Sequence, residues 1–293
     1  MVKASAMKGM SRDFMNDHYT LLMPGLLYVV ATPIGNLEDM TYRAVRVLKE
    51  ADWIACEDTR TTGRLLKHYE IGTRTVSYHD HNEEARAAEL VERLLNGDTG
   101  ALVSDAGTPL LSDPGYRIVK AAVDAGVTVQ PLPGASALLA ALVVSGLPTD
   151  QFHFGGFLPA KAMQREKVLR ELLHEEATLV FYEAPHRVVE SLEAVQQTYG
   201  DRQVVAAREL TKMYEEVLRG TAGEIAANLK ARDMVRGEFV ILIAKGVAVS
   251  DRTVEEAVGD MIAAGVERMD AIKTVAKERG LSKREVYRMV AEK

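Results

Sequence analysis

The chain has 293 residues, of which 47% are hydrophobic, and it carries a formal net charge of −6 at pH 7. This length is long for one domain and sufficient for two. The negative charge excludes a protein that binds polyanions with its whole surface, so any nucleic acid must meet a local basic patch. No apolar run in the sequence reaches the roughly 20 residues that a membrane-spanning helix needs. The single cysteine, Cys56, excludes an internal disulfide bond and is typical of a reducing cytoplasm.

The most distinctive stretch is the segment 104–115, which is rich in Ser, Asp, Gly and Pro. It follows an apolar run at residues 100–103, which predicts a buried strand of a parallel sheet. A helical pattern at residues 116–125 comes after it. Most such connections need only about 2–6 residues, and ligands of α/β sheets bind beyond the carboxyl ends of the strands. We therefore predict a ligand-binding loop, in which Gly107 lets a ligand approach the backbone and Asp113 caps the next helix.

The first predicted strand covers residues 26–31 and leads into the loop Thr32-Pro33-Ile34-Gly35-Asn36-Leu37, with a helical pattern after it. This loop matches neither the GxGxxG fingerprint of dinucleotide-binding domains nor the GxxxxGK[ST] loop of nucleoside triphosphatases. A nicotinamide-dependent oxidoreductase and a nucleoside triphosphatase are therefore both disfavoured.

Polar residues follow two further predicted strands, at residues 53–56 and 75–78. The first of these strands leads into Glu57-Asp58-Thr59-Arg60 and the second into His79-Asp80-His81-Asn82. Because parallel strands end at one edge of their sheet, both groups are expected at the ligand-binding edge. Helix capping by Asp58 and Asn82 is the alternative. The two histidines also suggest a metal site, which we disfavour because no further histidine or cysteine lies at a suitable spacing.

The second half of the chain repeats the alternation of strands and helices. A strand at residues 127–132 leads into the small-residue segment 133–137, whose backbone amides suit a ligand carboxylate. Residues 145–150 then break the pattern. Further strands are predicted within 152–159 and at 178–182, 204–207, 216–219 and 239–245, and a helix is predicted to open at Pro185 and run through Val195.

The C-terminal segment is helical in pattern, and Ser282 followed by Glu285 predicts a capped helix start. From Lys273 to the end it holds seven basic and three acidic residues, so this face is either solvated or in contact with a phosphate backbone. The patterns together predict an α/β protein in four parts. These are a disordered leader at 1–25, an N-terminal α/β domain at 26–146, a C-terminal α/β domain at 147–249 and a basic helical tail at 250–293.

Six stretches occur in an order shared with a known family, at residues 27–37, 57–60, 79–83, 104–115, 133–136 and 182–187. Over residues 26–290 the chain resembles the small-subunit ribosomal RNA (cytidine-2′-O)-methyltransferases, a branch of the tetrapyrrole methylase superfamily. The resemblance implies two α/β domains of the tetrapyrrole methylase type, with S-adenosyl-L-methionine bound in the cleft between them. It further implies a homodimer that acts on the decoding region of 16S ribosomal RNA within the small ribosomal subunit, with no membrane partner.

The resemblance also implies which residues bind the cofactor. They are Pro33, Asp105, Ala106, Gly107, Thr108, Ser136 and Ala137 in the first domain, and Tyr182, Ala207 or its neighbour Ala206, Glu238 and Phe239 in the second. Members that modify tetrapyrroles usually carry Gly-Asp-Pro where this chain has Gly107-Thr108-Pro109. This departure agrees with the RNA-modifying branch.

A ribose 2′-hydroxyl is a weak acid, so a base or a charge-stabilising group near it helps its methylation. The candidate catalytic residues are Glu57, Asp58 and Glu183. The residues expected to face the substrate are Arg60, His79, His81, Asn82, His186 and Arg187. Their three histidines are further candidate bases, and their two arginines suit phosphate. The sequence leaves the choice among these bases open.

Two other functions remain open at this stage. A methylase of a small tetrapyrrole-like acid would use the same cofactor, but it would need basic residues for the acid's carboxylates and no basic helical tail. A non-catalytic nucleotide-binding module would leave the polar strand ends of both halves without a purpose.

Overall fold

The structure is a computed structural model that describes residues 25–246 and 253–291. The predicted leader, apart from Gly25, lies outside the described residues. By contacts between Cα atoms the chain divides into two compact units. Within the described residues, the first unit comprises 25–30, 41–105 and 113–133, and the second 31–40, 106–112, 134–246 and 253–291. Two loops that follow strands of the first unit thus belong to the second.

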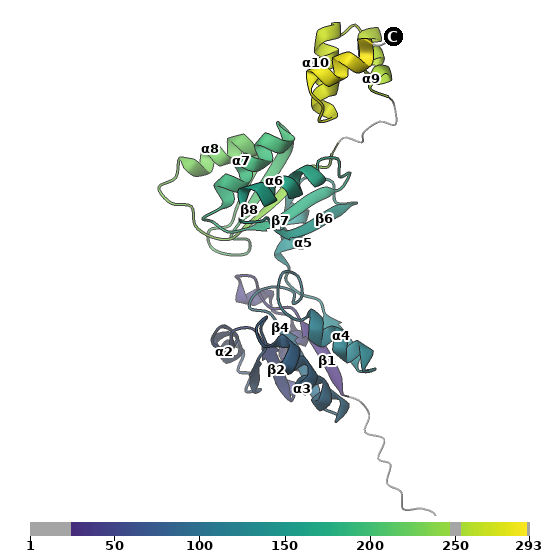
Figure 1. Cartoon of the computed structure of the whole chain (residues 1–293). Coiled ribbons are helices and arrows are strands. Elements are labelled where there is room, and N and C mark those ends of the chain that lie inside the picture. The colour runs from purple at the N-terminus through teal and green to yellow at the C-terminus, as the bar shows by residue number, and fades with distance from the viewer. Residues whose placement is uncertain (1–24, 247–252, 292–293) are drawn as a thin grey trace, which may run out of the picture. The chain divides into compact units, whose positions relative to one another are not determined.

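The first unit is built on a sheet of five parallel strands in the order β3-β2-β4-β1-β5, which confirms the predicted parallel sheet (Figure 1). Its strands are β1 (Leu26–Val30), β2 (Trp53–Cys56), β3 (Thr75–Ser77), β4 (Thr99–Val103) and β5 (Thr128–Leu132). The helices between them are α1 (Tyr42–Glu50), α2 (Thr59–His68), α3 (Glu83–Leu95) and α4 (Tyr116–Asp124), and a short 3-10 turn, η1 (Leu37–Asp39), precedes α1. Strand β2 is buried at every position, so Cys56 is a core residue.

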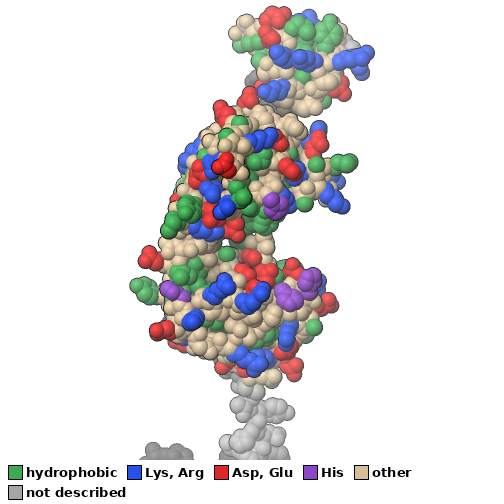
Figure 2. All heavy atoms as spheres, turned by 90° about the vertical axis from the view of Figure 1, so that its left-hand side faces the viewer, with side chains coloured by type: hydrophobic (Ala, Val, Ile, Leu, Met, Phe, Trp, Pro, Cys, Tyr) green, Lys and Arg blue, Asp and Glu red, His purple; other side chains and the backbone are tan. Residues whose placement is uncertain are grey.

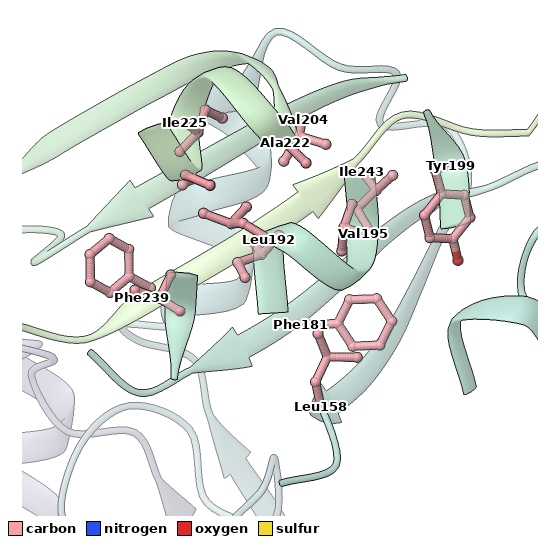
Figure 3. Close-up of a cluster of buried hydrophobic side chains, with 14 of the residues drawn as sticks. Leu158, Phe181, Leu192, Val195, Tyr199, Val204, Ala222, Ile225, Phe239 and Ile243 are labelled. Atoms are coloured by element: carbon pink, nitrogen blue, oxygen red, sulfur yellow. The ribbon is translucent and has the colours of Figure 1, made fainter. Parts of the chain in front are cut away.

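The second unit contains a mixed five-stranded sheet in the order β6-β7-β10-β8-β9. Strand β10 (Phe239–Ile243) is antiparallel to both neighbours, β7 (Thr178–Glu183) and β8 (Gln203–Arg208). The edge strands are β6 (Phe152–Phe157) and β9 (Glu216–Thr221), and the helices are α5 (Ala137–Ser145), α6 (Ala162–Glu171), α7 (Val188–Tyr199) and α8 (Ala222–Lys230). One face of this sheet holds a core that includes Phe181, Leu192, Ile225 and Ile243 (Figure 3). Burial of such side chains is the main favourable term in folding.

Helix α5 packs against β7, β8, β9 and β10 of this second sheet. The division by contacts therefore falls between Pro133 and Gly134, upstream of the boundary expected at residues 146 and 147. The residues of α5 are nearly all apolar, and its buried side includes Leu138, Ala141 and Leu142. This burial joins α5 to the second sheet.

The structure corrects the predicted start of α7 and supplies a helix that the sequence analysis omitted. Helix α7 begins at Val188 and not at Pro185, because the backbone N–H of Ala184 and the side chain of Arg187 both bind the Glu183 carboxylate and form a turn. Helix α8 follows β9 directly. Its start carries a capping box of Thr221 and Glu224, a sequence signal that could have predicted it.

The tail consists of α9 (Val254–Ala263), α10 (Arg268–Glu278) and α11 (Lys283–Ala291). The predicted cap of α11 is confirmed, because Ser282 and Glu285 exchange backbone and side-chain hydrogen bonds of 2.8 and 3.2 Å. Among the residues that the structure describes, no helix is long and apolar enough to cross a membrane.

Candidate cofactor and substrate site

Three loops of the second unit, which follow β1, β4 and β5, are joined by hydrogen bonds and by close approach of their backbones. Thr32 and Gly107 form an isolated antiparallel bridge with N···O distances of 2.8 and 3.0 Å. The Thr108 hydroxyl donates to the carbonyl of Ala135 at 3.1 Å. A Cβ atom added at Gly134 would lie only 2.8 Å from the Cβ of Ala31. The predicted ligand loops therefore meet, and small residues permit their close approach.

The loop 104–115 has an unusual backbone. Gly107 has a φ of +85°, and the non-glycine residues Leu110 and Ser112 have φ values of +73° and +70°. Left-handed conformations of such residues are costly and cluster at functional sites. The backbone thus favours a binding role for this loop over a plain connection.

The predicted contacts of the second half gather around one hydrophobic cluster. Ile34, Leu138 and Ala207 are buried in it, and Ala137 and Tyr182 are partly buried against it. The ring of Tyr182 lies edge-on to Phe154 and Phe157, with centroid distances of 4.9 and 5.6 Å. Phe157 is exposed, so this aromatic group can offer an apolar surface to a ligand.

Two further predicted residues lie at the start of β10. Glu238 is exposed, and its carboxylate accepts from the Nζ of Lys212 at 3.0 Å. Lys212 also lies against Gly35, where an added Cβ would come within 2.2 Å of its Cγ. The Pro33 loop and the segment before β10 are thereby joined through Lys212. Phe239 differs, because its side chain is buried in the hydrophobic core.

Ser136 caps α5, and its hydroxyl accepts from the N–H of Leu139 at 3.4 Å. It is therefore a structural cap, and its backbone lies at the start of a helix, where a negative ligand group is favoured. Pro33 is buried and Ala106 is exposed. Ser136, Pro33, Ala106 and Gly107 therefore contribute mainly their backbone groups to the loops of the second unit.

Acidic residues line the carboxyl edge of the first sheet. Asp105 follows β4, and its Oδ1 accepts from the N–H of Asp58, which follows β2, at 3.2 Å. Partial desolvation, and then the carboxylates of Asp105 and Asp80, raise the pKa of Glu57. Figure 2 shows acidic side chains in red beside purple histidines on the surface of this unit. The structure thus brings together the predicted polar strand ends of the first half.

Asp58 is confirmed as the N-cap of α2. Its carboxylate binds the N–H of Arg60 at 2.8 Å and the Arg60 guanidinium at 2.8 and 3.1 Å. The hydrogen bonds from Arg60 lower the pKa of Asp58 to about 2. Such a carboxylate is a weak base at neutral pH, whereas the Arg60 side chain itself is largely exposed.

Asp113 is a candidate base that the sequence did not indicate, because its position before α4 predicted a helix cap. That interpretation is wrong, since Gly115 is the N-cap of α4 and no side chain caps the helix. Burial, and then repulsion from Glu57, Asp105 and Asp80, raise the pKa of Asp113 to about 7. A carboxyl group with this pKa is a much better proton acceptor than Asp58. The signal in the sequence was a fifth acidic residue at the sheet edge that also holds Glu57, Asp58, Asp80 and Asp105.

His79 and Asn82 form a small polar group after β3. The N–H of His79 donates to Oδ1 of Asn82 at 2.9 Å, and Nδ2 of Asn82 lies 3.3 Å from Nε2 of the ring. Nδ1 of His79 is buried without a hydrogen-bond partner in the described part of the chain. His81 is exposed and its ring lies edge-on to that of His79 at 5.9 Å. Within the described ranges no group of three or more His, Cys, Asp or Glu residues is arranged to hold a metal ion.

Glu183 has a structural environment. Its Oε1 accepts from the N–H of Ala184 at 2.9 Å and from the Arg187 guanidinium at 2.5 and 2.9 Å, and its Oε2 accepts from the Ser191 hydroxyl at 2.5 Å. The carboxylate is fully buried. Buried charges of this kind are retained where they are fully hydrogen-bonded, and this one fixes the turn before α7. His186 in the same turn is exposed.

Two sheets of this topology and the joined loops between their strands define an α/β methyltransferase of the tetrapyrrole methylase type. Residues 26–226 match the family model for Tetrapyrrole (Corrin/Porphyrin) Methylases, and the chain belongs to this family. The family uses S-adenosyl-L-methionine as its methyl donor.

Named relatives are similar over nearly the whole chain. The ribosomal RNA small subunit methyltransferase I of Halalkalibacterium halodurans is 48% identical over 90% of this chain and 93% of its own length. Its counterpart in Bacillus subtilis is 46% identical over 90% of this chain and 93% of its own length. A crystal structure of diphthine synthase has the same fold, with a TM-score of 0.57 at 18% identity, over 76% of this chain and 90% of that chain.

The residues present fit S-adenosyl-L-methionine. Its adenine requires an apolar surface, which the cluster around Ile34, Leu138 and Tyr182 supplies. Its ribose and amino acid ends require hydrogen-bonding groups, which loops with accessible backbones such as that at Ala106 supply. The loops after β1, β4 and β5 are called the cofactor cradle. A side chain at Gly107 would place its Cβ 3.2 Å from Cγ2 of Ile34, so the shape of the cradle depends on the absence of that side chain.

Proposed function

We propose that this protein transfers a methyl group from S-adenosyl-L-methionine to the ribose 2′-oxygen of a cytidine in the decoding region of 16S ribosomal RNA. The observation that carries this proposal is the 48% identity, over 90% of the chain, to a relative named ribosomal RNA small subunit methyltransferase I. Thr108, which stands where tetrapyrrole-modifying members usually carry aspartate, also supports it. The Thr108 hydroxyl donates to the Ala135 carbonyl, whereas an ionised aspartate would have no proton to donate. The resemblance of the sequence motifs to the (cytidine-2′-O)-methyltransferases supports the 2′-oxygen of cytidine as the acceptor.

Methyl transfer to a ribose hydroxyl places two requirements on the protein. S-adenosyl-L-methionine supplies an electrophilic methyl group on a sulfonium. The protein has to hold the 2′-hydroxyl in line with that methyl group and accept its proton. Of the candidate bases, Asp58 is tied to Arg60 and Glu183 is saturated by four donors. Asp113 is the proposed proton acceptor, because its pKa of about 7 matches neutral conditions. Besides burial, repulsion from the neighbouring carboxylate of Glu57 contributes to that pKa.

The remaining polar residues are proposed to position the RNA. Arg60 has an exposed side chain after β2 and suits a phosphate. His79, His81 and Asn82 form the neighbouring polar edge, on which His81 is exposed. Arg187 is proposed as a weaker contributor than Arg60, because only 20% of its side chain is exposed and its partner Glu183 is fully buried. His186 lies exposed in the same turn and is proposed as a further contact.

The protein is further proposed to act as a homodimer in the cytoplasm on the assembled small subunit. Helix α5 exposes apolar side chains at Leu139 and Val143, which lie one turn apart. An exposed apolar stripe on a helix is a typical interaction surface, and a second copy of the chain is its proposed occupant.

The alternative acceptor is a small tetrapyrrole-like acid. A labelled methyl group on S-adenosyl-L-methionine distinguishes the two when small ribosomal subunits lacking the modification, naked small-subunit RNA and a tetrapyrrole acid are offered in parallel. Label in either RNA sample supports the proposal. Label in the tetrapyrrole alone contradicts it.

A further inference from the structure

The tail forms a small helical unit with its own core. Val258 of α9, four residues of α10 and Val286 of α11 are buried together. Gly280, with a φ of +63°, turns the chain between α10 and α11, and the N–H of Leu281 donates to the carbonyl of Ala276 at 2.9 Å. The unit is a pair of helices joined by a tight turn and closed by a third helix, the arrangement of helix-turn-helix modules.

Charge is segregated within this unit. Residues 253–267, which include α9, hold four acidic residues and no basic residue. Residues 268–291, which include α10 and α11, hold seven basic and three acidic residues. In Figure 2 the tail, at the top, presents Lys and Arg side chains in blue among acidic and apolar ones. The positive charge therefore belongs to two helices and not to the unit as a whole.

The basic residues of α11 share its outer side. Val286 is buried, while Lys283, Arg284, Tyr287 and Arg288 are all exposed. The spacing of these four residues places them on one face of the helix. Among residues 25–246 and 253–291, neither Lys283 nor Arg284 takes part in an ion pair. This outer face is called the α11 basic face below.

Folding does not explain the position of two of these cations. Lys283 and Arg284 lie in the first turn of α11, where the helix dipole disfavours positive charge by about 0.3–1 kcal/mol. Tyr287 is 50% exposed between them and Arg288. An aromatic ring among cations is the combination that single-stranded nucleic acids bind, with bases stacked on the ring and phosphates on the cations.

We infer that the α11 basic face binds an unpaired segment of the substrate RNA. Lys283, Arg284 and Arg288 contact its phosphates, and Tyr287 stacks on a base. The inference rests on the proposed function, because it takes the substrate to be RNA. It explains how a protein with a net charge of −6 presents a positive surface to a polyanion.

The test uses the full chain and measures binding of a small-subunit RNA fragment at several salt concentrations. The double variant K283E/R284E is expected to bind at least tenfold more weakly, with a salt slope smaller by about 1–2. Tyr287→Ala is expected to weaken binding by about tenfold without changing that slope. The matched control K167E/R170E changes the charge equally on the exposed side of α6 and is expected to bind RNA as the unaltered protein does. Binding of S-adenosyl-L-methionine, measured by calorimetry, is expected to be equal in all four proteins.

Equal RNA affinity and equal salt slope in all variants would overturn the inference alone. Failure of the unaltered protein to bind the RNA fragment would also overturn the inference, whereas the proposed function is overturned only if small ribosomal subunits receive no label either. If the variants of the α11 basic face bind RNA normally but no longer methylate assembled subunits, the inference would also be overturned, because the face would then recognise a ribosomal protein.

Discussion

Thr32 and Gly107 exchange two backbone hydrogen bonds and so join the loop after β1 to the loop after β4. Gly107 adopts a φ of +85° to do so, and an added Cβ would lie 3.2 Å from Ile34. The pairing needs a residue that has no side chain and tolerates a left-handed backbone. The proposed cofactor cradle depends on it.

Gly107→Val is expected to weaken binding of S-adenosyl-L-methionine at least tenfold while the protein remains folded. The matched control is Gly126→Val, because Gly126 has a similar φ of +76° but open space around it. Both variants carry the cost of a left-handed β-branched residue, about 1–2 kcal/mol. Calorimetry that gives equal affinities for the two variants would contradict the role of the loop.

Asp113→Asn is expected to lower the rate of methyl transfer by about 10²–10⁴-fold, because the amide cannot accept the proton. In the unaltered protein the rate is expected to rise with pH through an apparent pKa near 7, which belongs to the coupled carboxylates as a group. The control is Asp124→Asn, a surface residue paired with Lys120. A rate for Asp113→Asn within threefold of the unaltered enzyme would exclude Asp113 as the base.

The raised pKa of the Asp113 carboxyl also makes the stability of the folded protein depend on pH. Burial raises the pKa of Asp113 from about 4 in the unfolded chain to about 7 in the fold, so the folded protein binds this proton more tightly. The stability that this tighter proton binding gives to the fold is therefore fully present below pH 4 and is lost as the pH rises through 7. Urea unfolding at pH 5 and pH 8 is expected to show that Asp113→Asn gains stability over the unaltered protein mainly at pH 8. An equal gain at both values would contradict the burial of the charge.

Glu183→Ala is expected to destabilise the protein by about 3–5 kcal/mol, because it leaves Arg187 without its buried partner. Ser191→Ala, which removes one donor to the same carboxylate, is expected to cost about 1–2 kcal/mol. Chemical unfolding measures both values. A Glu183→Gln variant with unchanged stability and no methyl transfer would instead make Glu183 catalytic.

Much of the fold follows from local sequence signals, and parts of the site do not. The apolar runs at β2 and β4 and the Ser282 cap were predictable, because each depends on neighbouring residues alone. The start of α7 was not, because it depends on how Glu183 binds residues that follow it. Asp113 was hidden for a similar reason, since its pKa depends on its burial and on Glu57, Asp105 and Asp80. Glu57 and Asp80 are brought to this edge by β2 and β3.

Val143→Glu is expected to convert a dimer into a monomer, because it places a charge in the exposed apolar stripe of α5. Val123→Glu is the matched control, as Val123 is a comparably exposed valine on α4. Sedimentation of both variants beside the unaltered protein checks this expectation. A monomeric unaltered protein with full activity would contradict the proposed dimer.

The proposed acceptor atom is the 2′-oxygen of a cytidine, and analysis of the labelled nucleosides identifies the atom that receives the methyl group. Small-subunit RNA labelled by the enzyme from S-adenosyl-L-methionine is digested to nucleosides, which are separated and identified by mass. The account predicts that the label is recovered in 2′-O-methylcytidine and that Asp113→Asn reduces its amount. Label on a base, on another nucleoside or only on a tetrapyrrole acid would contradict it.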